Sequence, residues 1–437
     1  MPAPHPTFRE ALRFWLKLGF ISFGGPSGQI AIMHTELVEK KKWIGEDRFL
    51  HALNYCMLLP GPEATQLATY CGWLLHRTWG GIAAGVLFVL PSALLLWLLS
   101  YVYVAYGQVA WIAAAFSGLK PAVTAIVIAA VIRIGQRTVK TWLMAALAAG
   151  AFAALFFFHA PFPGVVVAAA AVGFIGGKFF PQWFPSDDAA KTIENTATID
   201  DRDAAPEHTQ PSWTRAFKVL TISLVLWWAP VIAAGIWQGW HGTLAQQGFF
   251  FSKAAMVTFG GAYAVLPYVG QQAVEHYGWL STAQMLDGIG LAETTPGPLI
   301  MVLQFVGFLG GWNQPGALSP LLAATLGAAV TTWTTFVPCF LWIFLGAPHI
   351  EQLRGNLHLS RSLSAVTASV VGVILNLAVW FGLHVFFPAR GVIDWFALAV
   401  CIAAFTAIQR FKVGVIPIVV AAALLGISKH ALLQNGF

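Results

Sequence analysis

The residues best suited to handling a charged solute are two lysines and three carboxylates that lie within or beside apolar runs. Lys17 and Lys253 place a cation where charge is costly and usually functional. Two ammonium groups suit a doubly charged oxyanion. The alternative is that both lysines are anchors whose ammonium groups reach the membrane surface. Glu63, Asp287 and Glu293 are candidates for carrying protons.

The same apolar runs are interrupted by Gly and Pro at four places. Proline removes an N–H group and glycine permits unusual backbone angles, so both residues break a helix. Such a break inside hydrocarbon is tolerated only where it is buried in protein or lines a cavity. Pro62 and Pro298 suit the first position of a helix, whose free amides favour an anion. The predicted substrate-binding residues are Lys17, Gly24, Gly25, Pro26, Ser27, Pro60, Gly61, Pro62, Thr65, Gln66, Lys253, Gly260, Gly261, Thr294, Thr295, Pro296, Gly297 and Pro298.

The carboxylates differ in how specifically they point to function. Glu63 directly follows a break, and a carboxylate in the first turn of a helix is also what the helix dipole alone favours. Asp287 and Glu293 lie in an apolar half-helix before the Pro296-Gly297-Pro298 break, which makes them the better candidates for proton coupling.

The chain contains one unit twice. FWLKLGFISFGGP from Phe14 matches FFSKAAMVTFGGA from Phe250 without a gap, at a constant register of 236 residues (250 minus 14). The same register places Pro60-Gly61-Pro62 on Pro296-Gly297-Pro298. Breaks at equal register in both copies favour a binding site over simple kinks, since repeated discontinuous helices are typical of transporters.

Composition identifies the class of protein. Of the 437 residues 58% are hydrophobic and only 10% are charged, and the mean hydropathy is +0.71. A soluble domain carries about a quarter charged residues. Lysine and arginine lie mostly between apolar runs, so the net charge of +6 indicates membrane orientation rather than a nucleic-acid partner. We therefore predict an all-α polytopic membrane protein.

Apolar runs define the expected spans. Each half should hold two interrupted segments, 8–40 and 49–77 in the first half, followed by four spans. The expected domains are a repeat at 1–180, a polar cytoplasmic linker at 181–214, a linking transmembrane helix at 215–241 and a second repeat at 242–437. The expected spans are 82–103, 109–132, 142–159, 164–179, 216–240, 319–345, 363–386, 393–407 and 413–432.

Positive charge predicts how the halves are oriented. If each interrupted segment returns to its starting side, each half crosses an even number of times and the linking helix inverts the second half. Nearly all lysines and arginines between spans then lie on one side, which is the cytoplasmic side. We therefore expect inverted-topology repeats in an inner membrane, with a cytoplasmic N-terminus and a periplasmic C-terminus.

Four motifs resemble a known family. FGGPSGQIAIMHTELVEKKKWI from Phe23, LLPGPEATQLATYCGW from Leu58, FGGAYAVLPYV from Phe259 and TTPGPLIMVLQFVGF from Thr294 are similar to the long two-domain form of the chromate ion transporter (CHR) family. The resemblance implies a bacterial inner-membrane protein that exports chromate, a sulfate-like tetrahedral dianion, and so confers chromate resistance. Sulfate or another oxyanion is the alternative substrate.

The favoured function is therefore secondary transport rather than catalysis. The histidines and cysteines show no metal-ligand spacing and no nucleotide-binding motif is present, so we expect no enzyme activity, metal or cofactor. The expected partners are a small oxyanion and the lipid bilayer, and a homodimer is compatible with the sequence. An anion channel and an integral-membrane enzyme with a midplane active site are alternatives from other classes.

Overall fold

The computed structural model describes residues 5–23, 25–107, 109–183, 212–259, 261–349, 357–388 and 392–434. Within these ranges the regular structure is helical, as predicted, and seven helices are long and apolar enough to cross a membrane. The predicted linker lies mostly outside the described residues, as do Gly24 and Gly260 and the side chain of Ser27.

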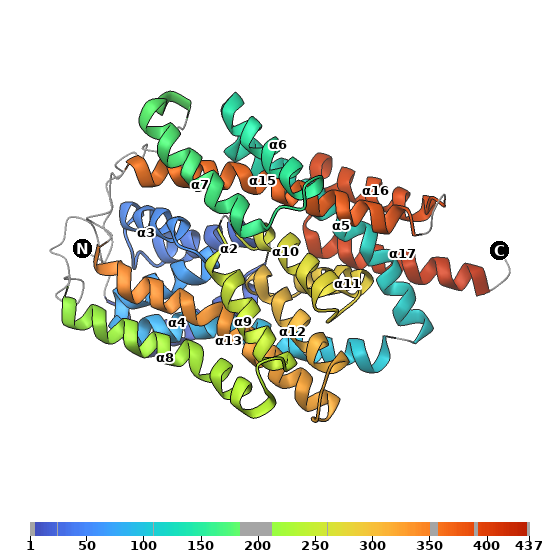
Figure 1. The fold of residues 1–437 in the computed structure, drawn as a ribbon, viewed down its shortest axis with the longest axis horizontal. Helices are drawn as coiled ribbons and strands as arrows, with labels where there is room; N and C mark the ends of the chain where they lie inside the picture. Colours follow the sequence, from blue (N-terminus) through green and yellow to red (C-terminus); the bar gives the residue numbers. More distant parts are fainter. Residues whose placement is uncertain are drawn as a thin grey trace.

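The first half begins with three short helices, which are followed by the 44-residue α4 (Figure 1). A π-helical turn, Thr35–Lys40, extends α2. The helices of this half are α1 (Phe8–Ile21), α2 (Gly25–His34), α3 (Glu46–Leu58), α4 (Glu63–Tyr106), α5 (Ala110–Thr138), α6 (Trp142–Phe156) and α7 (Phe162–Phe179).

The second half repeats this order after α8 (Trp213–Gln238). It includes an equivalent π-helical turn, Gln272–His276, after α10. A short 3₁₀ turn, Leu299–Met301, precedes α12. The helices of this half are α9 (Thr243–Met256), α10 (Ala262–Gln271), α11 (Thr282–Thr294), α12 (Val302–Asn313), α13 (Pro320–Gly346), α15 (Leu357–Phe386), α16 (Trp395–Phe411) and α17 (Val415–Gln434).

Most predicted spans coincide with long helices. The exceptions are α6, which has 15 residues, and α16, which has 17. Both are shorter than the roughly 20 residues that a perpendicular crossing needs. The predicted separation of segment 49–77 from span 82–103 corresponds to a reversal at His76 and Arg77, whose backbone angles are non-helical.

Glycines let the helices on either side of this reversal pack closely. A Cβ on Gly80 would lie 2.2 Å from the Gly72 carbonyl oxygen. The second half has the same arrangement between α12 and α13, where a Cβ on Gly327 would lie 2.3 Å from the Gly307 carbonyl oxygen. Each half thus contains a tight helical hairpin that only a residue without a side chain permits at these crossings.

Buried side chains from both halves form one main hydrophobic cluster. It includes Trp15 and Phe88 from the first half and Trp279, Phe305 and Phe381 from the second. In Figure 1, α10 and α11 lie at the centre of the molecule, with α4 and α13 on one side and α15 on the other. The two halves therefore share a core rather than forming separate domains.

Candidate functional site

The two Pro-Gly-Pro segments separate short helices, as the sequence predicts. Pro60-Gly61-Pro62 lies between α3 and α4, and Pro296-Gly297-Pro298 lies between α11 and the 3₁₀ turn. Gly61 has φ of 123° and Gly297 has φ of 100°. Side chains rarely adopt these angles, which explains why glycine occupies the middle of each segment.

The two Gly-Gly segments also break the chain. Gly25 has φ of 69° and Gly261 has φ of 93°. The segments approach each other, since a Cβ on Gly261 would lie 3.7 Å from Pro26 Cγ, and no atom lies within 4 Å of a Cβ on Gly25. Open space therefore lies beside Gly25, and both Gly25 and Pro26 are half-buried.

The breaks of the two halves are joined by reciprocal hydrogen bonds. The Gly61 amide donates to the Thr258 carbonyl oxygen at 2.7 Å, and the Gly297 amide donates to the Ser22 carbonyl oxygen at 2.7 Å. Ser22 and Thr258 are equivalent in the register of 236 residues, as are Gly61 and Gly297. Each Pro-Gly-Pro segment is therefore held by the residue just before the Phe-Gly-Gly segment of the other half.

A second reciprocal contact lies behind the glycines. A Cβ on Gly297 would lie 2.6 Å from Ser92 Cβ on α4, and a Cβ on Gly61 would lie 3.1 Å from Cys339 Sγ on α13. Ser92 follows Pro91 and Cys339 follows Pro338, which gives a register of 247 residues (338 minus 91). Such exchanged contacts are what a two-fold relation between the halves produces.

Several buried polar atoms around the breaks have no hydrogen-bond partner among the described residues. These atoms are Ser22 Oγ, Gln29 Oε1, Thr65 Oγ1, Gln66 Oε1 and Ser92 Oγ. Leaving a buried polar group unpaired costs about 1–3 kcal/mol, so a concentration of them points to a ligand or to water. Thr65 and Gln66 belong to the sequence-predicted site, whereas Ser22, Gln29 and Ser92 were not predicted.

Other polar groups at the breaks have partners. The Gln29 side-chain amide donates to the Gly297 carbonyl oxygen, and that of Gln66 donates to the Pro60 carbonyl oxygen. The hydroxyls of Thr294 and Thr295 donate to backbone carbonyl oxygens one turn earlier. Their predicted contact with substrate would therefore use the oxygen as an acceptor or require that this bond break.

The carboxylates beside the breaks lie near a pair of arginines. Glu293 is buried and accepts a hydrogen bond from the Tyr263 hydroxyl, whereas Glu63 is half-buried at the start of α4. Arg133 lies within electrostatic reach of Glu293, and Arg137 lies within reach of Glu63. The arginines are one turn apart on α5, so one helix carries positive charges that act over a distance on carboxylates from both halves.

Asp287 forms a separate cluster that the sequence did not predict. Its Oδ2 accepts a hydrogen bond of 2.9 Å from the Tyr103 hydroxyl, and its Oδ1 lies 3.7 Å from Lys120 Nζ. Asp287 is 4% exposed, so this ion pair is largely removed from water. Lys120 stands in the apolar sequence of α5, and that intramembrane charge was the signal that could have identified it.

The predicted lysines lie on exposed faces of their helices. Lys17 shares its face of α1 with exposed Leu16 and Phe20, and Lys253 shares its face of α9 with Met256. The counter-charge role of these lysines stays a prediction. Within the described residues no group of three or more His, Cys, Asp or Glu side chains is arranged to hold a metal ion.

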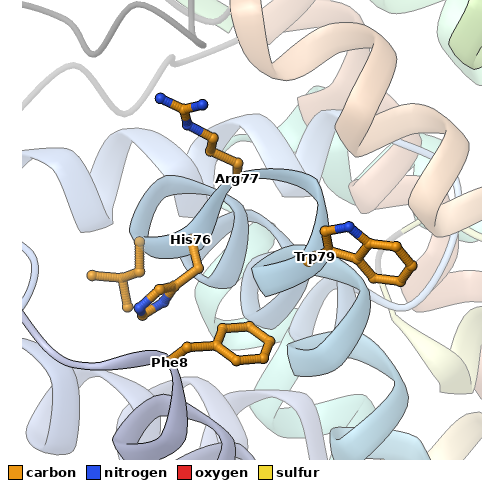
Figure 2. A pocket seen from close by; sticks show the side chains of 5 residues that line it. Phe8, His76, Arg77 and Trp79 are labelled. Carbon is orange, nitrogen blue, oxygen red and sulfur yellow. The ribbon is translucent and has the colours of Figure 1, made fainter.

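A pocket lies away from these breaks, at the reversal in α4. It is lined by Phe8, Leu75, His76, Arg77 and Trp79. Figure 2 shows the rings of Phe8 and His76 close together and the Arg77 side chain directed away from them. The His76 ring also contacts the Pro6 carbonyl oxygen at 3.0 Å. These contacts join the N-terminal segment to the reversal and include none of the predicted site residues.

Comparison with known proteins gives matches along most of the chain. The model of the chromate transporter family matches residues 9–174 and 245–427, one stretch in each half. A chromate transport protein of Cupriavidus metallidurans is 28% identical, covering 99% of this chain and 96% of its own. A chromate transport protein of Pseudomonas aeruginosa is 30% identical, and the match covers 85% of this chain and 80% of that protein. An uncharacterized transporter of Methanocaldococcus jannaschii is 23% identical, and the match covers 97% of this chain and 94% of that protein. No solved structure matches the chain.

Proposed function

Because the chain belongs to the chromate transporter family, we propose that it is a secondary transporter that exports chromate across a bacterial inner membrane. Export would lower the chromate concentration in the cytoplasm and so confer resistance. The similarity to proteins named chromate transport protein supports chromate over other oxyanions.

The observation that carries this proposal is the reciprocal pairing of the breaks. Gly61 binds the Thr258 carbonyl oxygen and Gly297 binds the Ser22 carbonyl oxygen, so the two halves meet at their irregular segments. Broken helices that meet at a repeat interface are the usual place for a solute in transporters. The unpaired hydroxyl groups of Ser22, Thr65 and Ser92 provide donors for oxyanion oxygens there.

Coupling to protons is the proposed energy source. Glu63 and Glu293 lie beside the two breaks, and Asp287 lies about 1.7 turns before Glu293 on α11. Protonation of Asp287 would weaken its attraction for Lys120 and free an ammonium group for the anion. Proton movement and anion movement would be linked in this way, because Asp287 takes up a proton when Lys120 leaves it to bind the anion.

Uptake into inverted membrane vesicles tests this function. Labelled chromate and labelled sulfate are supplied separately, with a pH gradient and a membrane potential imposed one at a time. We expect chromate to accumulate unchanged, driven by the pH gradient. Flux that only equilibrates chromate would indicate a channel, and chemically altered chromate would indicate an enzyme. Accumulation of sulfate but not chromate would identify another oxyanion transporter.

A further inference from the structure

The pocket at the reversal in α4 contains none of the predicted transport residues. Its volume is about 560 Å³, within the usual range of roughly 300–1,000 Å³ for a small-molecule site. Its apolar lining consists of Phe8, Leu75 and Trp79, and its polar lining consists of His76 and Arg77. Phe8 is 42% exposed and Trp79 is 74% exposed, so part of this lining lies on the surface of the protein.

Arg77 holds a backbone conformation that suits glycine. Its φ is 54° and its ψ is −152°. Residues with a side chain rarely adopt such angles, and outliers of this kind concentrate at functional sites. A glycine would adopt the same angles without strain, so the reversal itself gives no reason for an arginine at this position. The arginine therefore indicates that its side chain has a role beyond forming the turn.

The Arg77 guanidinium group is available to a ligand. It is exposed, and among the described residues it has no hydrogen-bond or ion-pair partner. Figure 2 shows it directed away from the rings of Phe8 and His76. A guanidinium group can bind a phosphate through two parallel hydrogen bonds. The apolar lining beside it offers a surface to a hydrocarbon chain attached to that phosphate.

The second half has no equivalent cation. In the register of 236 residues, Arg77 corresponds to Asn313 and Trp79 corresponds to Pro315. The Asn313 side-chain amide donates to the Trp279 carbonyl oxygen, so the polar group at this position stabilises the loop. The first half thus places an unpaired cation at a turn where the second half has a structural hydrogen bond.

An exposed apolar stripe leads from the pocket along α4. Val86, Leu90, Leu94 and Leu98 are each more than 40% exposed and recur at every fourth residue, which places them along one side of the helix. Trp79 lies seven residues, about two turns, before Val86 and so begins this stripe. Because α4 is long and apolar enough to cross a membrane, the stripe faces acyl chains. A tryptophan at its end is typical of the boundary between hydrocarbon and headgroups.

The pocket lies on the side of the membrane where the chain begins. The His76 ring contacts the Pro6 carbonyl oxygen at 3.0 Å, and α1 begins at Phe8. The N-terminus is predicted to be cytoplasmic, which places the pocket at the cytoplasmic leaflet. Anionic phospholipids give that leaflet a negative surface, and basic pockets beside membrane helices bind their headgroups.

We propose that this pocket binds one anionic phospholipid, with its phosphate on the Arg77 guanidinium group and an acyl chain passing Trp79 onto the exposed stripe of α4. The bound lipid stabilises the contact between the N-terminal segment and the reversal, because Phe8 and His76 line the same pocket. The site lies away from the breaks, so it does not depend on which anion is transported.

Native mass spectrometry of the full-length protein tests binding, with phosphatidylglycerol and phosphatidylcholine of equal chain length as probes. We expect one phosphatidylglycerol to be retained in preference to phosphatidylcholine. Arg77→Gln should weaken its binding about tenfold, and Arg77→Lys should weaken it less because the charge remains. The matched control Arg410→Gln, which removes an exposed arginine of α16, should leave binding unchanged. Equal retention of the two lipids, or equal losses in Arg77→Gln and Arg410→Gln, would overturn the site.

Arg77→Gly separates lipid binding from folding. The variant relieves the backbone at φ of 54°, so without lipid it should unfold in detergent at a temperature at least as high as the wild-type protein does. Added phosphatidylglycerol should raise the unfolding temperature of the wild-type protein but not that of the variant. A lower unfolding temperature of the lipid-free variant would show that the side chain serves the fold. An equal rise in both proteins would show that the lipid binds elsewhere, and either result would overturn the proposal.

Soluble anions and the apolar lining identify what the pocket recognises. Inorganic phosphate and chromate lack an acyl chain, so at equal concentration they should not displace phosphatidylglycerol. Trp79→Ala removes apolar lining and keeps Arg77, and it should also weaken phosphatidylglycerol binding. Displacement of the lipid by either anion, or full retention in Trp79→Ala, would mean that the pocket binds a free anion and would overturn the lipid site.

Discussion

At the scale of single residues, the glycines of the two breaks combine a backbone requirement with a packing requirement. Gly297 needs a positive φ and also leaves room for Ser92. Other glycines meet only the first requirement. Gly316 has φ of 60° and no atom lies within 4 Å of the position of its Cβ.

This contrast leads to a prediction for Gly297→Ala. Gly316→Ala should lower the free energy of unfolding only by the backbone strain, about 1–2 kcal/mol. Gly297→Ala adds a Cβ 2.6 Å from Ser92 Cβ, so it should lower the thermal unfolding temperature further and abolish chromate uptake. Thermal unfolding in detergent and uptake in liposomes measure both effects. Equal behaviour of the two variants would show that the contact with Ser92 is not needed.

Glu293 is predicted to affect coupling more than folding. Glu293→Gln keeps the size of the side chain and its hydrogen bond with Tyr263, but the side chain can no longer take up or release a proton. We expect the dependence of transport on pH to flatten while thermal stability changes by less than about 1 kcal/mol. Tyr263→Phe is the control that removes the bond and keeps the carboxyl group. If the pH profile of Glu293→Gln matches that of the wild type, Glu293 is not in the coupling mechanism.

Lys17 and Lys253 are predicted to supply counter-charge from matching positions of the two halves. Lys17→Gln and Lys253→Gln should weaken chromate binding, and arginine should be tolerated better because it keeps the charge with a different shape. Inward and outward uptake measured separately should show unequal changes, since the two lysines would serve opposite sides. Unaltered affinity in both directions would identify them as membrane anchors, in agreement with their exposed helix faces.

At the scale of helices, the close crossing within each hairpin determines how the breaks are supported. Gly307 and Gly327 bring α12 and α13 together directly after the Pro296-Gly297-Pro298 break. A shift of these helices would displace Gln304, whose side-chain amide donates to the Ala93 carbonyl oxygen beside Ser92. The hairpin therefore contributes to positioning Ser92 against the break.

The hairpin predicts opposite effects of the same substitution at two helical glycines. Gly327→Ala places a Cβ 2.3 Å from a carbonyl oxygen and should destabilise the protein by about 1–3 kcal/mol. In α6, no atom lies within 4 Å of the position of a Cβ on Gly150. Gly150→Ala should therefore stabilise the protein by up to about 1 kcal/mol, because alanine has the higher helix propensity. Thermal unfolding of both purified variants measures the difference. If Gly327→Ala is as stable as the wild-type protein, α12 and α13 can move apart without a loss of stability, which contradicts the prediction.

The repeat and the breaks were predictable because glycine and proline act locally. A residue that must adopt φ near 100° is visible in the sequence, and its duplication at equal register strengthens the prediction. Ser22 and Ser92 were not predictable in this way. Their importance arises from contacts between segments far apart in the chain, and a single serine in an apolar helix is usually satisfied by its own backbone. Lys120 carried a local signal, but its partner Asp287 comes from the other half.

At the scale of the whole molecule, the described helices extend between two ends. In Figure 1, α8 begins at the left-hand end, as does the described part of α15, while α17 ends at the right. If this direction is the membrane normal, the start of α8 and the end of α17 lie on opposite sides. The positive charges between spans then favour the end at which α8 begins as cytoplasmic.

Reporter fusions test this orientation. A fluorescent protein fused to the N-terminus should fluoresce, and alkaline phosphatase fused to the C-terminus should be active because it folds outside the cytoplasm. Each reporter exchanged to the opposite end is the control and should be inactive or weaker. Activity of phosphatase at both ends, or at neither, would contradict an odd number of crossings.

The reciprocal bonds between the breaks have a consequence for biogenesis. While the ribosome is still making the second half, the amide of Gly61 is already in the membrane but Thr258 has not yet been inserted. The first half must therefore wait with an unsatisfied backbone group in an apolar environment, which costs several kcal/mol. A chain truncated between the halves would keep this defect permanently. The cell's membrane quality-control proteases would accordingly degrade the isolated first half, and co-expression of the second half should protect it.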